Sequence, residues 1–125
     1  MQINEISGMA VDAAIKVHKA LGPGLLGSAY EACLEYELKK RGLRVQRQLE
    51  LPVVYAGVEI DAGYRIDLLV EDLVVIELKS VEKLEGIHEA QLLTYLELSG
   101  KKLGLLINFN VVRLKEGLKR MVLDL

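Results

Sequence analysis

The chain is poor in several residue types, and each shortage limits what it can be. Its 125 residues include one cysteine, two prolines, one phenylalanine and no tryptophan. The single cysteine, Cys33, excludes an internal disulfide and a zinc site built from cysteines. We expect Cys33 to be a small buried side chain of a helix, between Ala32 and Leu34. No repeat, linker or low-complexity segment is found, so we predict a single domain spanning residues 1–125.

Long apolar runs and an excess of positive charge are also missing. No segment approaches the roughly 18 consecutive apolar residues of a membrane helix. Residues 1–5 have neither a basic flank nor an apolar core, so we expect a mature, cytoplasmic protein. The chain has 16 Lys and Arg against 18 Asp and Glu, a net charge of −2. This balance does not favour a protein that holds nucleic acid by charge alone, although a bound metal cation would offset part of it.

Apolar residues recur at helical spacing in three segments and at strand spacing in several others. The expected helices cover residues 6–21, 26–41 and 87–98. The expected strands cover residues 43–55, 58–60, 64–70, 73–79, 103–109 and 118–123. The continuous apolar run at 73–76 indicates a central strand buried on both faces, and the last strand is expected at an edge. This order predicts an α/β fold in which helices flank a mixed β-sheet.

Asp67, Glu77 and Lys79 lie near the centre of the predicted sheet. Glu77 and Lys79 are two apart on a strand, so their side chains project to the same face. If the loop between the two strands has three residues, 71–73, Asp67 lies directly opposite Glu77; a loop of two residues would shift it by one. Cross-strand neighbours are about 5 Å apart, which is close enough for two carboxylates to share a divalent cation.

The chemistry of this trio is that of a metal site. Two carboxylates at the end of a buried strand repel each other and are costly to desolvate, and a hard cation removes that conflict. Oxygen ligands with retained water suit Mg²⁺ or Mn²⁺, and the backbone carbonyl of Leu78 could supply another ligand. Lys79 could orient or help deprotonate a bound water and stabilise charge on a phosphate. The spacing E-x-K alone is uninformative, because Glu37 and Lys39 share it on what we expect to be a solvated helix surface.

Four polar residues on the predicted helices could complete the site. Gln91 and Tyr95 are four apart and share a helix face; Gln91 could bind the attacking water or a phosphate, and Tyr95 could donate to a phosphate oxygen. Glu31 and Glu35 are one turn apart, and either could act as an additional metal ligand or as a base that holds water. The alternative for each is an ordinary exposed or half-buried helix side chain.

The histidines and several basic residues are weaker candidates. His18 and His88 lack metal-ligand spacing, so we expect each to cap or pack rather than to bind a metal. Some basic side chains could line a phosphate groove or could simply be solvated. These are Arg44, Arg47, Lys101 and Lys102.

Five stretches of the chain follow a recognisable order: residues 18–26 with Tyr30 and Glu31, then 64–70, 76–79, 88–95 and 104–109. Together they resemble the GxxExxY protein family of bacteria and archaea, which looks like a compact branch of the PD-(D/E)XK nuclease superfamily. The resemblance implies a restriction-endonuclease-like core with Asp67, Glu77 and Lys79 as signature residues. It also places Gln91 and Tyr95 on the Q-x-x-x-Y motif of exonuclease-like branches. We take Tyr30 and Arg65, which lie in these stretches, as candidate substrate-binding residues.

One position departs from the family's pattern. The motif G-x-x-E-x-x-Y falls on Gly24, Gly27 and Tyr30, so glycine stands where the family has glutamate. Gly27 can neither bind a metal nor activate water. Glu31 is one turn further along the same face and could take its place. Alternatively, the site is weakened and the chain keeps the fold for binding.

The sequence therefore predicts a Mg²⁺- or Mn²⁺-dependent nuclease that hydrolyses phosphodiester bonds, with DNA as the expected substrate. The competing hypothesis is a weakened or inactive module on the same fold that binds nucleic acid or protein as a homodimer. A small-molecule phosphohydrolase is a third possibility, supported only by the same carboxylates. The choices between DNA and RNA, and between internal and terminal cleavage, stay open.

Overall fold

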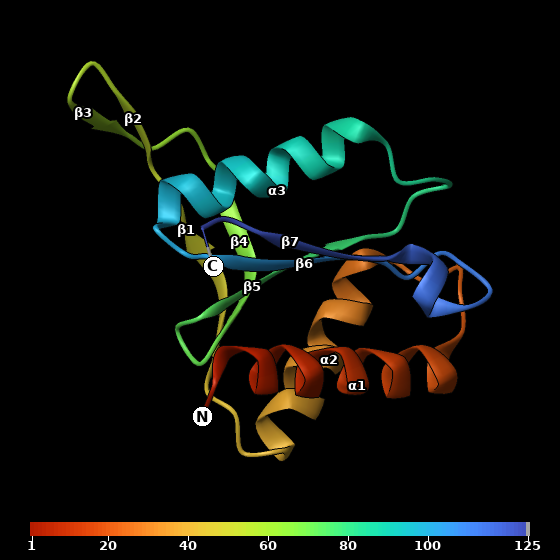
Figure 1. Cartoon of the computed structure of the whole chain (residues 1–125). Helices are drawn as coiled ribbons and strands as arrows, with labels where there is room; N and C mark the ends of the chain where they lie inside the picture. The colour runs from red at the N-terminus through yellow and green to blue at the C-terminus, as the bar shows by residue number, and fades with distance from the viewer. Residues whose placement is uncertain (125) are drawn as a thin grey trace.

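The computed structural model describes residues 1–124, which form three helices, seven strands and one short 3₁₀ turn (Figure 1). The helices are α1 (Ile3–Leu21), α2 (Gly27–Lys40) and α3 (Gly86–Ser99), and the turn is η1 (Leu114–Gly117). The strands are β1 (Val45–Glu50), β2 (Val53–Tyr55), β3 (Val58–Ile60), β4 (Arg65–Val70), β5 (Val74–Lys79), β6 (Leu103–Asn108) and β7 (Leu118–Val122). No helix in this part of the chain is long and apolar enough to cross a membrane.

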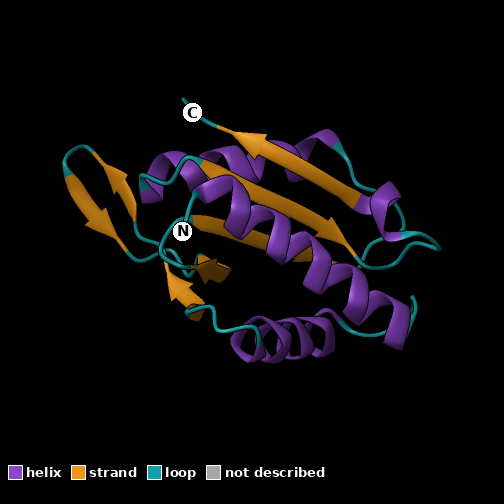
Figure 2. Ribbon diagram, turned by 60° about the horizontal axis from the view of Figure 1, so that its bottom comes forward, coloured by secondary structure: helices purple, strands orange, loops and turns teal. Residues whose placement is uncertain are grey.

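Five of the strands form one sheet, in the order β1-β4-β5-β6-β7. Neighbouring strands are antiparallel except β5 and β6, which run parallel and are joined by α3. Helices α1 and α2 lie against one face of this sheet and α3 lies against the other (Figures 1 and 2). The predicted mixed sheet flanked by helices is confirmed, and β7 is the expected edge strand.

The helices form where apolar side chains recur along one face. In α1, Ile6, Ala10 and Ala13 are buried, and small side chains at the last two positions let α1 lie close to its neighbours. In α2, Leu34 and Leu38 are fully buried one turn apart. Both faces join the larger of two apolar clusters, which fills the space between α1, α2 and the sheet.

Alternation along β5 decides which side chains face which layer. Ile76 and Leu78 belong to the cluster beneath α1 and α2, whereas Val75 packs in the cluster beneath α3. Because side chains two apart share a face, Glu77 and Lys79 lie on the same side as Val75, toward α3. The layering of the fold thus presents both residues to α3.

Helix α3 approaches the sheet closely over β6. A Cβ atom built on Gly104 would lie 2.9 Å from Cδ1 of Leu92, a fully buried side chain of α3. Only a residue without a side chain leaves room for Leu92 at this distance. Gly104 therefore sets how near α3, with its polar residues, comes to the central strands.

The expected strand over residues 43–55 is wrong, because it is two strands in two sheets. β1 ends at Glu50, and β2 pairs only with β3 in a separate hairpin that projects from the body (Figure 1). Pro52 has no N–H to donate to a sheet ladder, and Leu51 turns into the apolar cluster beneath α3. The chain therefore leaves the main sheet at these two residues.

Two expectations for α2 are also wrong. Cys33 is exposed, because the buried face of the helix is centred on Leu34 and Leu38. Glu37 is 8% exposed rather than solvated. Its carboxylate contacts Lys16 of α1 at 3.2 Å and Arg41 at 3.2 Å, and this charge pairing accounts for its place between the two helices.

Candidate active site

The β4–β5 hairpin brings Asp67 opposite Glu77. Its Cα partners are Val70 with Val74 and, further along, Leu68 with Ile76, so the loop between the strands has the three residues 71–73. Glu71 and Asp72 in this loop have positive φ angles of 52° and 58°, which close the turn tightly. Of the two registers left open by the sequence, the structure has the one that pairs the carboxylates.

Beyond Leu68 and Ile76, hydrogen bonds to carboxylate side chains take the place of backbone–backbone hydrogen bonds between β4 and β5. The backbone N–H of Asp67 donates to Oε1 of Glu77 at 3.2 Å, and the N–H of Leu78 donates to Oδ2 of Asp67 at 2.9 Å. Each carboxylate is thus fixed by the backbone of the opposite strand. Glu77 is only 4% exposed and is held largely away from water, whereas Asp67 is half-buried.

Burial changes the acidity of both carboxyl groups. Burial, together with the neighbouring Asp67, raises the pKa of Glu77 to about 8, while Lys79 opposes the change. The pKa of Asp67 is raised mainly by burial and also by the nearby Glu31, although the Leu78 N–H bond opposes this. Neighbouring carboxyl groups whose pKa values are raised by burial and by each other are typical of functional sites.

The donors at this position fit a divalent cation. Hard cations bind carboxylate oxygen and relieve the repulsion between two buried acids. Residues 1–124 contain no group of three or more His, Cys, Asp or Glu side chains arranged to hold a metal ion. The oxygen donors that fit are the carboxylates of Asp67 and Glu77, which Mg²⁺ and Mn²⁺ accept together with water.

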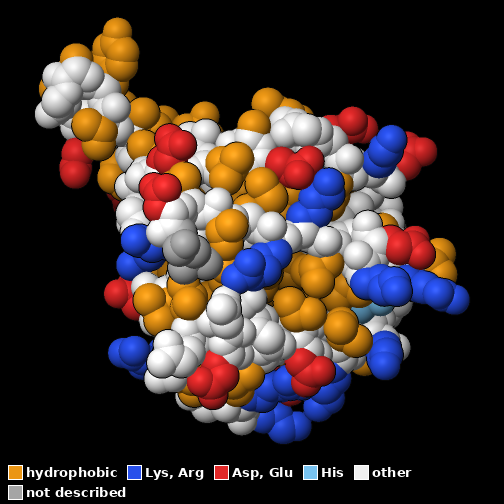
Figure 3. Space-filling view, viewed as in Figure 1, with side chains coloured by type: hydrophobic (Ala, Val, Ile, Leu, Met, Phe, Trp, Pro, Cys, Tyr) orange, Lys and Arg blue, Asp and Glu red, His pale blue; other side chains and the backbone are white. Residues whose placement is uncertain are grey.

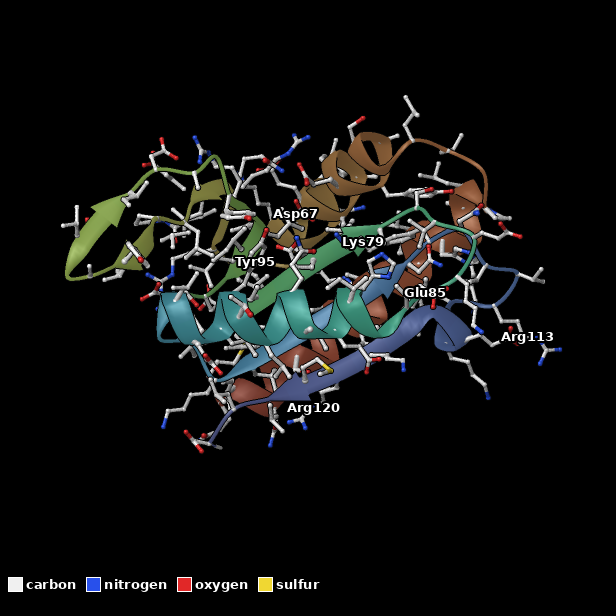
Figure 4. The ribbon with its side chains drawn as sticks, turned by 90° about the horizontal axis from the view of Figure 1, so that it is seen from above. Asp67, Lys79, Glu85, Tyr95, Arg113 and Arg120 are labelled. Atoms are coloured by element: carbon white, nitrogen blue, oxygen red, sulfur yellow. The ribbon has the colours of Figure 1, made fainter. Side chains whose placement is uncertain are left out.

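A hydrogen-bonded row of side chains connects β5 to α3. Lys79 Nζ donates to Gln91 Oε1 at 3.1 Å, and Gln91 Nε2 donates to the Tyr95 hydroxyl at 3.3 Å. Burial and the nearby Glu77 raise the pKa of Tyr95, so its hydroxyl remains a proton donor. Figure 4 shows Asp67, Lys79 and Tyr95 gathered between α2 and α3. The structure brings these predicted residues together at one place.

Glu31 reaches the same place from α2. Its side chain is buried, and its carboxylate contacts Arg47 Nε at 2.7 Å. Arg47 also contacts Glu35 at 3.5 Å, so one guanidinium serves both acids of α2. Glu31 lies near Asp67, whereas Glu35 is turned toward Arg47 and Lys39.

Gln48 is a site residue that sequence reasoning missed. Its Nε2 donates to Glu31 Oε1 at 2.8 Å and to Asp67 Oδ1 at 3.3 Å, so it joins α2 to β4. Its backbone has a φ of 54°, a left-handed conformation that is unfavourable for glutamine. Gln48 looks like an ordinary polar partner in an alternating strand, and nothing in the sequence signals this conformation.

Gly27 lies at the first turn of α2, beside the end of β5. The Ser80 hydroxyl, just after β5, donates to the carbonyl of Leu25 at 2.9 Å. A Cβ atom on Gly27 would meet nothing within 4 Å, and its φ is not in the left-handed region. This position therefore has room for a larger side chain at the edge of the site.

Several other candidates lie apart from the carboxylates or have other partners. Tyr30 is fully buried, its ring stacks on Phe109 with centroids 4.5 Å apart, and its hydroxyl donates to the Gly22 carbonyl at 2.5 Å. These contacts place Tyr30 in the core, so it is not among the residues that can contact a substrate. Arg65 is half-buried and donates to Asp61 at 3.4 Å and to the Tyr64 carbonyl at 2.8 Å.

The histidines cap and pack, as expected. His18 is buried with Nε2 2.8 Å from the Val111 carbonyl, and His88 Nδ1 accepts from the Glu85 N–H at 2.8 Å at the start of α3. The four basic candidates do not line one groove. Arg47 is at the site, but the others are paired elsewhere: Arg44 with Glu71, Lys101 with Asp72, and Lys102 with the Asp124 carbonyl.

A pocket of about 740 Å³ opens beside Lys79, between the β2–β3 hairpin and α3. The rings of Tyr64 and Tyr95 meet edge to face at its wall, with centroids 5.9 Å apart. The hairpin beyond it carries exposed apolar side chains, and Figure 3 shows them on the projecting arm. These are Val54, Tyr55, Val58 and Ile60.

An α/β sheet flanked by helices, with two paired carboxylates and a lysine at the end of its central strands, defines a restriction-endonuclease-like nuclease fold. The chain belongs to the PD-(D/E)XK nuclease superfamily, whose sequence profile matches residues 4–121. Nucleases of this superfamily generally use divalent metals, and their substrates are nucleic acids. Comparisons with curated proteins and with solved structures gave no significant match.

Proposed function

We propose that this chain is a Mg²⁺- or Mn²⁺-dependent nuclease that hydrolyses phosphodiester bonds in DNA. The observation that carries the proposal is the pair of buried Glu77 and half-buried Asp67, with the pKa of Glu77 raised to about 8 beside Lys79. Such a pair is unfavourable unless a cation neutralises it, and a nuclease-fold chain has a use for that cation. We further propose that residues 1–125 act as one cytoplasmic domain of the GxxExxY branch.

Each side chain has a chemical role in this proposal. Asp67 and Glu77 would hold the cation, the Leu78 carbonyl would be a further ligand, and Glu31 would hold a water beside it. A bound divalent cation supplies charge neutralisation at the phosphate and acidifies the attacking water. Lys79 lies near Glu77 and can orient that water or donate to a phosphate oxygen as charge develops.

The α3 residues position Lys79 and contact the substrate. Gln91 holds Nζ of Lys79 at 3.1 Å, which fixes the ammonium group beside α3, where its charge lowers the pKa of Glu77. Tyr95 keeps its proton because its pKa is raised, so its hydroxyl can donate to a non-bridging phosphate oxygen. Arg65, two residues before Asp67 on β4, would exchange its contact with Asp61 for one with a neighbouring phosphate.

The test is cleavage of single- and double-stranded DNA and RNA with Mg²⁺, with Mn²⁺ and with chelator. We expect cleavage of DNA that requires the metal and is lost in Glu77→Ala and Lys79→Ala. Glu35→Ala is the matched control, since Glu35 pairs with Arg47 and Lys39 rather than with Asp67. Cleavage that persists in both site variants would reject the assignment and indicate a contaminant.

The structure also favours a second candidate, a module that binds nucleic acid or protein as a homodimer without cutting. The supporting observation is that Glu31 is already engaged by Arg47 at 2.7 Å and by Gln48 at 2.8 Å, while Gly27 offers no carboxylate. Calorimetry with Mn²⁺ separates the two. Millimolar binding that is lost in Asp67→Ala supports the nuclease, and absence of binding by any divalent metal supports the module.

A further inference from the structure

We propose that the pocket between the β2–β3 hairpin and α3 receives an unpaired nucleobase, so that the substrate is single-stranded DNA or DNA with an unpaired nucleotide. The inference rests on the proposed nuclease function and names the substrate form for the same site. The pocket includes Lys79, Gln91 and Tyr95, the row of side chains that leads from the carboxylates. A nucleotide whose phosphate lies at Lys79 can therefore place its base in this pocket.

The walls of the pocket have the chemistry that a base requires. Tyr64 is 43% exposed and its ring meets that of Tyr95 edge to face, so part of the Tyr64 ring is open for stacking. Apolar side chains from both sides of the pocket, Val53, Ile87 and Leu98, complete a surface for a flat ring. Its volume of about 740 Å³ lies within the rough range of 300–1,000 Å³ typical of small-ligand sites.

Charge also favours an unpaired strand over a duplex. A duplex is held mainly by many contacts to its phosphates, and this chain has a net charge of −2. Of the cations around the carboxylates, Arg47 is paired with Glu31 and Arg65 with Asp61, which leaves Lys79 as the main contact for a phosphate. Stacking on aromatic rings contributes to binding without such charge, but the base must be out of the helical stack to use it.

Substitutions on α3 and on the opposite wall of the pocket, each with a control, provide the test. Thr94 is exposed and lines the pocket, so Thr94→Trp fills the space without disturbing the core. Thr94→Ser leaves the space open and is its matched control. Tyr64→Ala removes the stacking ring, and Tyr55→Ala removes an exposed tyrosine of the hairpin that does not line the pocket.

Binding is measured by fluorescence anisotropy with labelled single-stranded DNA and a blunt duplex of the same sequence, in Mn²⁺. All variants are made in a Glu77→Gln background, so that cleavage does not consume the probe. We expect the single strand to bind roughly tenfold or more tightly than the duplex. Tyr64→Ala and Thr94→Trp should weaken single-strand binding roughly 5- to 150-fold, because stacking contributes about 1–3 kcal/mol per base. The two controls should leave it unchanged.

Failure of this inference can be told apart from failure of the nuclease function. Equal binding of duplex and single strand, or pocket variants that bind like their controls, would overturn the base pocket even if the enzyme cuts DNA. If the unmodified chain cuts no DNA but the pocket variants still lose single-strand binding, the pocket stands and the nuclease proposal fails. Absence of any DNA binding rejects the pocket.

Discussion

Asp67 and Glu77 are each held by the backbone of the other's strand. The N–H of Asp67 donates to Glu77 at 3.2 Å, and the N–H of Leu78, next to Glu77, donates to Asp67 at 2.9 Å. The two acids therefore cannot move apart to reduce their repulsion without breaking bonds that close the sheet. In the absence of a cation, protonation is the remaining way to relieve it.

The first prediction follows from this constraint and concerns stability against pH in chelator. The pKa of Glu77 rises from 4.5 in the unfolded chain to about 8 in the fold, so the folded state binds the proton more tightly. The stability gained from this is complete below about pH 4.5 and is lost as pH rises to about 8. We expect the melting temperature to fall between about pH 5 and about pH 8.5. The free energy of unfolding falls over this range by an amount on the order of a few kcal/mol, since a tenfold change in proton affinity corresponds to about 1.4 kcal/mol.

Glu77→Gln should flatten this profile and raise the melting temperature at the alkaline end. Glu37→Gln is a matched comparison, because Arg41 and Lys16 lower the pKa of the Glu37 carboxyl. That variant should be less stable than the parent at the same pH. A Glu77→Gln protein whose melting temperature still falls like the parent's would contradict the proposed cause.

The second prediction concerns the left-handed backbone of Gln48. Gln48→Ala and Gln48→Gly both remove the amide that joins Glu31 to Asp67, but only glycine tolerates a φ of 54° without strain. We expect the glycine variant to be more stable by about 1 kcal/mol in urea unfolding. Both should lose Mn²⁺-dependent activity to a similar extent. Equal stability of the two variants would show that residue 48 is not strained.

The third prediction introduces at position 27 the carboxylate of the GxxExxY motif, the branch proposed for this chain. Gly27→Glu adds a side chain into open space, one turn before Glu31, at the edge of the site. We expect Mn²⁺ to bind roughly 10- to 100-fold more tightly, as measured by calorimetry, in line with the usual effect of residues that support a metal site. Gly27→Gln is the neutral control and should bind like the parent. If both variants behave alike, a carboxylate at this position does not contribute to the metal site.

The fourth prediction tests how closely α3 must pack. Gly104→Val places atoms against Leu92, where even a Cβ would be only 2.9 Å from Cδ1. Overpacking of this kind should lower the free energy of unfolding by roughly 1–3 kcal/mol. In a Leu92→Ala background the same change should cost less, which a double-mutant cycle measures. Additive effects would mean that the two residues do not press on each other.

Much of the fold could be predicted because it depends on spacing. The burial of Leu34 and Leu38, the central position of β5 and the edge position of β7 all follow from which residues are apolar and how far apart they are. The alternation along β5 also predicts, from the sequence alone, that Glu77 and Lys79 share one face. The register that pairs Asp67 with Glu77 was one of two that the sequence allowed, and the turn geometry decides it.

What could not be predicted depends on contacts between distant segments. The alternating pattern continues across Pro52, so it concealed the point where β1 leaves the sheet and the hairpin begins. Cys33 has apolar neighbours in sequence but faces solvent, because the layer that covers α2 lies on its other side. Gln48 joins the site only through its positive φ, which depends on the tertiary structure around it.

The sheet divides the site between two layers that are not equally secured. Glu31 comes from the side of α1 and α2, where the larger apolar cluster lies, whereas Gln91 and Tyr95 come from α3 and the smaller cluster. Helix α3 can therefore detach locally at a lower free energy than global unfolding requires. On heating, this protein should lose the proposed cleavage of DNA while most of its hydrogen-exchange protection in α1, α2 and the central strands survives.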